Sequence, residues 1–244
     1  MSHARRPAPR ARTDKEPDVR EVLRELARVG PFFDVPVGDR PPGDGFRPLG
    51  ELYGEGLGGY VAEVGRRLGS ADPRVAASTA QLGIASRMWS LGLGCAVLSG
   101  QVPDLAPDRV RWRLPPAGSL QLWLPEPVAL PGGELARTVL DGNLAVLDRA
   151  VRDRFGLSPR ILRGNAASAL VGALRVLMGR LPGPPYPPVP VVAGLLADDG
   201  PLAGTGTFVH EEGLGVAFVR RSCCLYYRVP TGGGLCGDCV LRTR

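Results

Sequence analysis

Apolar residues recur every three or four positions through much of the first 180 residues, a spacing typical of amphipathic helices. Asp72 and Pro73 give a start signal for the longest of them, because aspartate caps a helix N-terminus and proline suits its first position. We interpret Asn165, just before the last helix, as a cap or a packing residue, with a ligand contact as the alternative. The periodicity predicts helices at 17–29, at 57–68, from 73 onward, at 131–155 and at 166–179.

Two stretches change to the alternation of a β-strand. Residues 109–124 alternate apolar and polar positions on either side of a Pro/Gly turn, and residues 205–220 do the same, so each predicts a hairpin. Residues 181–190 contain six prolines and are interpreted as a stiff linker. We therefore expect an α+β fold, with a mainly helical domain at 17–190 and a β-rich segment at 191–244.

Composition and charge narrow the class of protein. Hydrophobic residues make up 44% of the 244-residue chain, as in ordinary folded proteins. No apolar run approaches the roughly 20 residues of a membrane span. The formal charge is +6, but no basic stripe is interleaved with aromatic residues, so we do not expect nucleic acid as a partner.

The first sixteen residues are polar, basic and proline-containing, which predicts a disordered tail at 1–16. The tail lacks the apolar core of a secretion signal, so a cytoplasmic protein is expected. A basic tail is also a candidate for peripheral contact with an acidic membrane face, although its simplest role is to keep the chain soluble.

Four of the five cysteines lie within residues 223–239, and this is the strongest chemical signal in the sequence. Cys223 and Cys224 are adjacent, eleven residues follow, and Cys236 and Cys239 form a Cys-x-x-Cys pair. Neighbouring side chains on a strand point to opposite faces, so the backbone must leave strand geometry for both members of the first pair to face one centre. Four thiolates suit a tetrahedral metal ion or an iron–sulfur cluster.

Four interpretations of these cysteines compete. Disulfides require an oxidising compartment, which a chain without a secretion signal does not predict. Structural zinc usually separates the ligands of each half-site, and a thioredoxin-like pair normally precedes a helix in a strand–helix unit. A [2Fe–2S] cluster held by four cysteines is the fourth interpretation. The fifth cysteine, Cys95, lies in an apolar run and is expected to be a small buried hydrophobe.

The stretches Arg221–Arg228 and Leu235–Leu241 resemble the C-terminal motif of FhuF-like ferric siderophore reductases. The family pattern has two adjacent cysteines, a gap, and then Cys-Gly-x-Cys; we interpret the gap of eleven here as one extra residue in a glycine-rich turn. The resemblance implies a bacterial cytosolic protein that reduces siderophore-bound iron(III) with a [2Fe–2S] cluster. The ligands that it implies are Cys223, Cys224, Cys236 and Cys239.

Arginines flank the cysteines on both sides. Arg220, Arg221 and Arg228 would offset the negative charge of a four-thiolate cluster and bind an anionic ferric siderophore or an acidic electron donor. No glycine fingerprint for a nucleotide is present, so a donor protein or a small reductant would supply the electron. The competing functions are a non-catalytic iron–sulfur electron carrier or sensor, and a zinc-stabilised binding protein.

Overall fold

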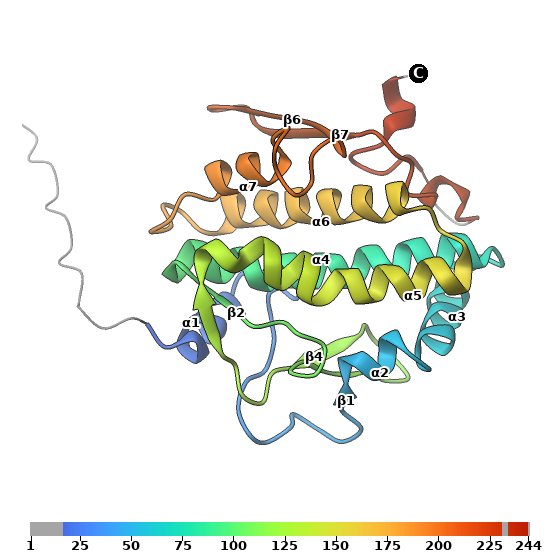
Figure 1. Ribbon diagram of the computed structural model, residues 1–244, viewed down its shortest axis with the longest axis horizontal. Coiled ribbons are helices and arrows are strands. Elements are labelled where there is room, and N and C mark those ends of the chain that lie inside the picture. Colours follow the sequence, from blue (N-terminus) through green and yellow to red (C-terminus); the bar gives the residue numbers. More distant parts are fainter. Residues whose placement is uncertain (1–16, 231–233, 244) are drawn as a thin grey trace, which may run out of the picture.

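The computed structural model describes residues 17–230 and 234–243, and three long helices form its middle (Figure 1). They are α4 (Pro73–Ser99), α5 (Ala145–Phe155) together with the π-helix that it continues (Arg137–Leu144), and α6 (Pro159–Arg180). α4 and α6 run in the same direction and pack against each other, and α5 returns beside them in the opposite direction. This helical middle, with small β-sheets on both sides, confirms the α+β class.

Shorter helices pack below and beside α4. They are α1 (Val19–Leu26), α2 (Leu49–Tyr53) and α3 (Leu57–Leu68), and α1 and α3 both contact α4. The predicted start signal of α4 is confirmed, because the Asp72 side chain accepts a 2.9 Å hydrogen bond from the Arg74 amide. A local side-chain cap therefore marks the start of α4, as Asp18 does for α1, whereas α2 and α3 begin without one.

Three small antiparallel sheets complete the fold. β3 (Arg111–Arg113) pairs with β1 (Arg47–Pro48) and β4 (Gln121–Trp123), β2 (Gln101–Pro103) pairs with β5 (Ala129–Pro131), and β6 (Gly206–Glu211) pairs with β7 (Gly215–Arg220). The first two sheets lie below the helices, and the β6–β7 hairpin lies above α6 and α7 (Figure 1). Both predicted hairpins are confirmed, whereas the β2–β5 pair was not predicted.

The helix predicted at 131–155 is not uniform. It begins as a 3-10 turn (Gly132–Glu134), continues as a π-helix (Arg137–Leu144) and becomes α-helical in α5. The π-helix holds the buried Asn143, whose amide donates to the Leu105 carbonyl and whose oxygen accepts from the Tyr53 hydroxyl at 2.7 Å. The π-helix thus contains a buried side-chain amide whose hydrogen-bond partners lie outside the helix.

α6 begins earlier than predicted. Its first residue is Pro159, and the Ser158 hydroxyl accepts a hydrogen bond from the Ile161 amide as the cap. Asn165 therefore lies inside α6 and is fully buried. The interpretation of Asn165 as a helix cap is wrong, because the helix has already completed its first turn there.

The proline-rich stretch at 181–190 is only partly irregular, because α7 (Pro188–Leu196) begins within it. α7 packs on α6 and contacts β6, so it continues the helical layer across residue 190. The predicted division into 17–190 and 191–244 thus falls inside a helix and stays a prediction as a domain boundary. The tail predicted at 1–16 lies outside the described residues.

α4 and α6 are each long and apolar enough to cross a membrane by length and composition, with a mean hydropathy of 1.3. This differs from the expectation that no apolar run would reach that length. The apolar stretches of the two helices are 67% and 61% buried inside the protein. Core helices of soluble proteins have the same properties, and we interpret both helices in that way.

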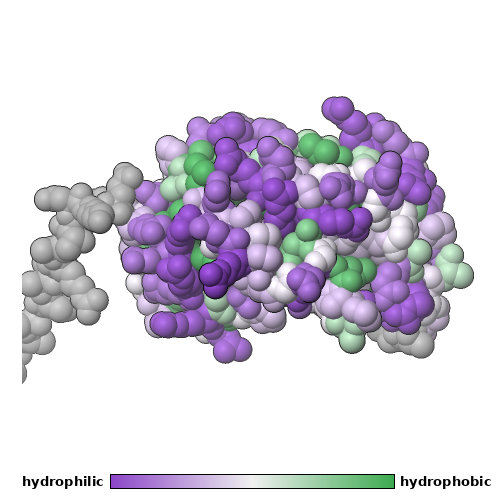
Figure 2. Space-filling model, turned by 90° about the horizontal axis from the view of Figure 1, so that it is seen from below, coloured by the Kyte–Doolittle hydropathy of each residue, from purple (hydrophilic) through white to green (hydrophobic). Residues whose placement is uncertain are grey.

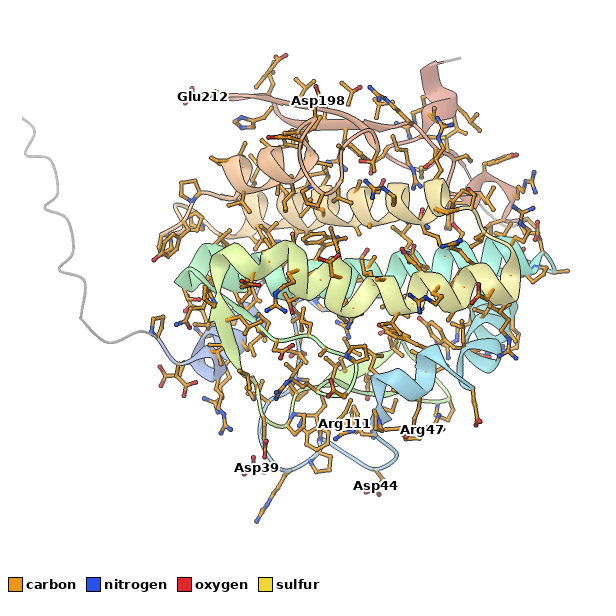
Figure 3. The ribbon with its side chains drawn as sticks, viewed as in Figure 1. Asp39, Asp44, Arg47, Arg111, Asp198 and Glu212 are labelled. Atoms are coloured by element: carbon orange, nitrogen blue, oxygen red, sulfur yellow. The ribbon has the colours of Figure 1, made fainter. Side chains whose placement is uncertain are left out.

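The surface carries charge of both signs. Seen from below, it is mostly hydrophilic, and hydrophobic residues form small separate patches (Figure 2). Asp39, Asp44, Arg47 and Arg111 project from the lower side, and Asp198 and Glu212 lie at the upper edge (Figure 3). These faces are those of an ordinary water-exposed surface.

Candidate metal centre

The cysteine segment follows directly from β7 and lies beside the first turns of α6 (Figure 1). After Arg220 the backbone leaves the strand, and Leu225 adopts a left-handed conformation with φ of 68°. The Leu225 amide turns back toward Cys223 Sγ, at 3.4 Å. The adjacent cysteines thus escape the alternation of a strand, as the sequence analysis expected.

The fold brings the two halves of the cysteine motif together. Cys224 and Cys236 are hydrogen-bonded through their thiols, and the charge of Cys239 acts on Cys236. Cys224 and Cys239 are buried, each 4% exposed, while Cys223 and Cys236 are half-buried. Each half therefore contributes one deep sulfur and one that lies nearer the surface.

Backbone amides are directed at two of the sulfurs. The Leu225 amide donates to Cys223 Sγ and the Leu241 amide to Cys239 Sγ, both at 3.4 Å. In each half the donor comes two residues after the cysteine. Such bonds stabilise the thiolate form over the thiol, as a metal-bound sulfur requires.

The hydrogen bond between Cys224 and Cys236 shifts the two thiols in opposite directions. Accepting it lowers the pKa of Cys224 to about 6 against the opposing effect of burial, and the Tyr226 amide and the Arg220 charge lower it further. The pKa of Cys236, which keeps the shared proton, is raised. At neutral pH the pair therefore contains one thiolate, the form that binds metal.

Arg220 lies beside these sulfurs with only 1% of its surface exposed. Its guanidinium donates to Asn165 Oδ1 at 2.7 Å, and at 3.4 Å to the Ile161 carbonyl and the Ser222 hydroxyl. None of these partners is charged, and a buried cation is costly without an anion nearby. The thiolate of Cys224 is the nearby anion, since Arg220 lowers its pKa.

This burial corrects one prediction. A siderophore cannot reach a side chain as deep as Arg220, so its expected contact with substrate is wrong, whereas its expected role in offsetting sulfur charge fits the structure. Arg221 and Arg228 are exposed, as a docking role requires. Arg228 is partly engaged by Asp72, at 3.5 Å.

A chain of polar side chains connects Arg220 to the three long helices. Asn165 on α6 donates to Gln81 Oε1 at 3.0 Å, and Gln81 on α4 donates to Asp148 on α5 at 2.9 Å. Asn165 and Gln81 are almost completely buried, so these bonds form away from water. The environment of Arg220 is thus fixed by the helical core.

Two further contacts hold the cysteine segment against α4 and α6. The Ser78 hydroxyl of α4 donates to the Cys224 carbonyl at 2.8 Å. Gly164 of α6 faces Arg220, and a Cβ at this position would lie 2.9 Å from Arg220 Nη2. The glycine therefore allows the helix backbone to approach the buried guanidinium closely.

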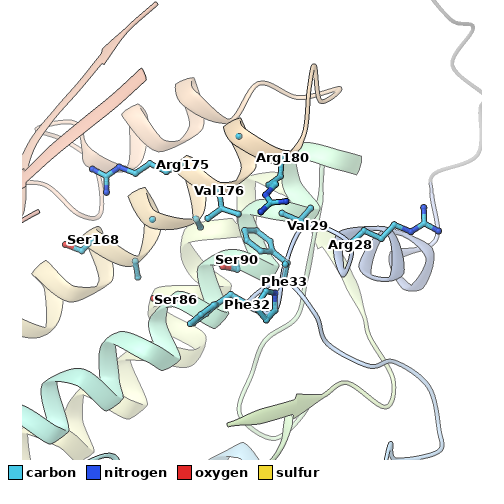
Figure 4. Close-up of a pocket in the computed structure, with 16 residues that line it drawn as sticks. Arg28, Val29, Phe32, Phe33, Ser86, Ser90, Ser168, Arg175, Val176 and Arg180 are labelled. Atoms are coloured by element: carbon cyan, nitrogen blue, oxygen red, sulfur yellow. The ribbon is translucent and has the colours of Figure 1, made fainter. Parts of the chain in front are cut away.

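A cavity of about 660 Å³ lies between α4, α6 and residues 28–33, near the site but not in it (Figure 4). Phe32 and Phe33 line it, Phe33 buried and Phe32 48% exposed. Arg175 belongs to its wall but directs its guanidinium away from the phenyl rings (Figure 4). That guanidinium forms a 2.8 Å ion pair with Asp238, inside the Cys-x-x-Cys turn, and so fixes the turn to α6.

The arrangement of the cysteines bears on which metal group they can hold. Within the described residues, no three His, Cys, Asp or Glu side chains gather closely enough for a single metal ion. A [2Fe–2S] cluster instead binds two thiolates to each iron and spreads four sulfurs over a larger site. The linked thiol pair, the amides directed at sulfur and the buried cation are features that fit such a cluster.

Comparison with protein families decides between the interpretations. Residues 220–241 match the family model of the FhuF 2Fe-2S C-terminal domain. The segment is an FhuF-type [2Fe–2S] domain. The resemblance seen in the sequence is thereby confirmed, and a [2Fe–2S] cluster is the cofactor of this domain. A comparison with curated proteins found no match.

All four candidate cysteines lie inside the FhuF-type domain, and we propose them as the cluster ligands: Cys223, Cys224, Cys236 and Cys239. Cys95 lies outside it, fully buried in α4, where burial raises the pKa of its thiol. Ser78, Asn165 and Arg175 support the FhuF-type domain from distant parts of the chain, and no local motif in the sequence predicts that role.

Asp148, at the far end of the polar chain, predicts a pH effect on stability. Burial raises the pKa of its carboxyl from 3.8 to about 6. Folding therefore takes up a proton between these two values, and stability falls as the pH rises through them. Asp148→Asn, which can keep the Gln81 contact, is expected to raise the free energy of unfolding at pH 7 by up to about 3 kcal/mol.

Chemical denaturation at pH 4 and pH 7 measures this effect. The gain from Asp148→Asn should nearly vanish at pH 4, where the carboxyl is protonated in the folded protein. Asp153→Asn, on the exposed side of the same helix, is the matched control and should change little at either pH. An equal gain at both pH values would contradict a raised pKa for Asp148.

Proposed function

We propose that the protein is a cytoplasmic ferric siderophore reductase, an oxidoreductase that passes one electron to iron(III) held by a siderophore. The observation that carries the proposal is the FhuF-type [2Fe–2S] domain at residues 220–241. When bound, the cluster supplies a one-electron redox centre. Siderophores hold iron(II) far less tightly than iron(III), so reduction releases the metal in the cytoplasm.

The protein contributes position and charge to this reaction. Cys223 and Cys236 are half-buried, so one edge of the domain lies near the surface and the path to a docked chelate is short. Arg221 is exposed beside Cys223 and supplies positive charge to a docking face. The described residues need no general acid or base, because only an electron is transferred.

The electron donor in this proposal is a separate protein or a small reductant. Exposed arginines such as Arg221 and Arg228 attract an acidic protein surface and speed its encounter with the domain. Among the described residues Arg228 forms an ion pair with Asp72, so Arg221 is the more available of the two. The partners proposed are thus a ferric siderophore and a donor, in turn, at the same edge.

The proposal predicts that reduced protein is reoxidised by ferric siderophores. Anaerobically purified protein is reduced with dithionite, desalted and mixed with excess ferric siderophore, and the return of the visible charge-transfer bands is followed. The rate should saturate with siderophore concentration, and an iron(II) chelator should recover one iron(II) per electron. Failure with hydroxamate, catecholate and carboxylate siderophores alike would favour a non-catalytic electron carrier.

A further inference from the structure

A second cavity, of about 410 Å³, opens beside the FhuF-type domain and is lined by three arginines. Arg160 and Arg163 come from the first turns of α6, and Arg221 comes from the segment just before the cysteines. The hydroxyl-bearing residues Thr205 and Ser222 also line it. No aspartate or glutamate is among the described residues that line this arginine pocket.

Two of the three arginines of the pocket are held in place by neutral partners. Arg160 donates to the Arg221 carbonyl at 2.9 Å, and Arg163 donates to the Pro201 carbonyl at 3.0 Å. Carbonyl oxygens orient a guanidinium without cancelling its charge. Positive charges near the N-terminus of a helix are unfavourable, because the helix dipole is positive there. Arg160 and Arg163 therefore do not stabilise α6 through its dipole. The positive charge of the pocket is therefore available to an anionic ligand.

The positive charge extends beyond this cavity. Arg163 also lines a smaller cavity of about 270 Å³, together with Arg149 and Arg152 of α5. Asp148 is the acid of that cavity, and it is turned to Gln81. In Figure 3 the labelled acids Asp198 and Glu212 lie along the upper edge, away from the start of α6. A chelate that approaches the two cavities therefore meets the guanidinium groups of α5 and of the start of α6.

The pocket lies next to one of the proposed cluster ligands. Ser222 lines the pocket and is the residue before Cys223, one of the two half-buried cysteines. A ligand held by Arg221 and Ser222 thus lies against the backbone that carries this cysteine. The pocket is smaller than a whole ferric siderophore, so it suits an anionic arm of a chelate whose iron stays outside, near the cysteine edge.

We propose that the arginine pocket selects anionic ferric chelates, whose carboxylate or catecholate oxygens bind Arg160, Arg163 and Arg221. The inference rests on the proposed reductase function and names its class of substrate. A guanidinium pairs with a free carboxylate in a two-point contact, and the net negative charge of a tricatecholate chelate is attracted to the three cations, whereas a neutral hydroxamate chelate offers neither. Neutral and cationic trihydroxamate chelates are therefore the poorer substrates.

Binding is tested with gallium(III) chelates, which cannot be reduced under these conditions and so report the pocket without electron transfer. Calorimetry with oxidised protein compares a gallium tricatecholate, a gallium polycarboxylate and a gallium trihydroxamate. The two anionic chelates should bind, more weakly as salt is raised, and their relative affinities identify which anionic group the pocket prefers. The double variant Arg160→Gln, Arg163→Gln should weaken both by at least about tenfold.

The matched control is the double variant Arg24→Gln, Arg28→Gln, which removes the same two charges at exposed positions in and just after α1 and should bind as the wild type does. Equal binding by the wild type and the double variant, or tighter binding of the trihydroxamate, would overturn the inference. So would inorganic phosphate that competes at concentrations similar to those of the chelate.

The same variants separate this inference from the proposed function. If anionic gallium chelates bind in the pocket but iron chelates never reoxidise the reduced protein, the reductase function is contradicted and the binding pocket is supported. If anionic ferric chelates reoxidise the double variant at the wild-type rate, the role of the pocket is contradicted and the reductase function is supported. Because binding and electron transfer are measured in separate experiments, one result does not stand in for the other.

Discussion

Cys236→Ser is expected to abolish or strongly alter the visible charge-transfer absorption of the anaerobically purified protein. Cys236 is half-buried and shares a hydrogen bond with Cys224, so it belongs to both the Cys-x-x-Cys pair and the contact between the two halves of the motif. A serine hydroxyl is a much poorer ligand for iron than a thiolate. Iron content per chain should fall together with the absorption.

Cys95→Ser is the matched control, because it makes the same chemical change at a buried position in α4 outside the FhuF-type domain. Its spectrum and iron content should equal those of the wild type, even if its stability is lower. Circular dichroism of both variants checks that the helices have formed. An unchanged spectrum in Cys236→Ser would remove Cys236 from the ligand set.

Arg220→Gln is expected to make the cluster harder to reduce. The buried guanidinium is a positive charge beside the sulfurs, and the reduced cluster carries one more negative charge than the oxidised one. At an effective dielectric constant of about 20, such a charge is worth roughly 2 kcal/mol, or on the order of 100 mV for one electron. The midpoint potential of the variant should therefore be more negative by an amount of this order.

Arg221→Gln removes the same charge from an exposed position one residue away, and it serves as the control. Water and salt screen an exposed charge, so its effect on the potential should be much smaller. A redox titration of both variants, followed by visible absorption or electron paramagnetic resonance, makes the comparison. Equal potentials in Arg220→Gln and the wild type would show that the buried charge does not act on the cluster.

The parts of the fold that depend on neighbours in sequence could be predicted. α3 and the start of α4 lie where the spacing and the Asp72 cap placed them. The start of α6 was missed because Asn165, which follows Gly164, was interpreted as a helix cap, although Ser158 and Pro159 form an ordinary start signal. Gly164 is instead a site of close approach, which the sequence alone does not distinguish from a turn.

The proposed ligands could be predicted from the sequence, whereas the residues that support them could not. The four cysteines lie close together in sequence, so their spacing alone indicated a metal centre. Arg220 was predicted to contact substrate as well as to offset cluster charge. Its burial depends on Asn165, which is 55 positions away, and nothing local indicates that the two residues meet. The pair of Arg175 and Asp238, 63 positions apart, is likewise a product of how α6 passes beneath the C-terminal segment.

The left-handed backbone of Leu225 has a consequence for the lifetime of the protein in air. A leucine in this conformation is strained by roughly 1–2 kcal/mol, and contacts on either side of it hold it there. One of these contacts is made to Cys223 Sγ, so oxidation of that sulfur would remove a restraint and let the loop relax. Reduction of the sulfur would then have to restore an unfavourable backbone conformation as well, so damage is easier than recovery.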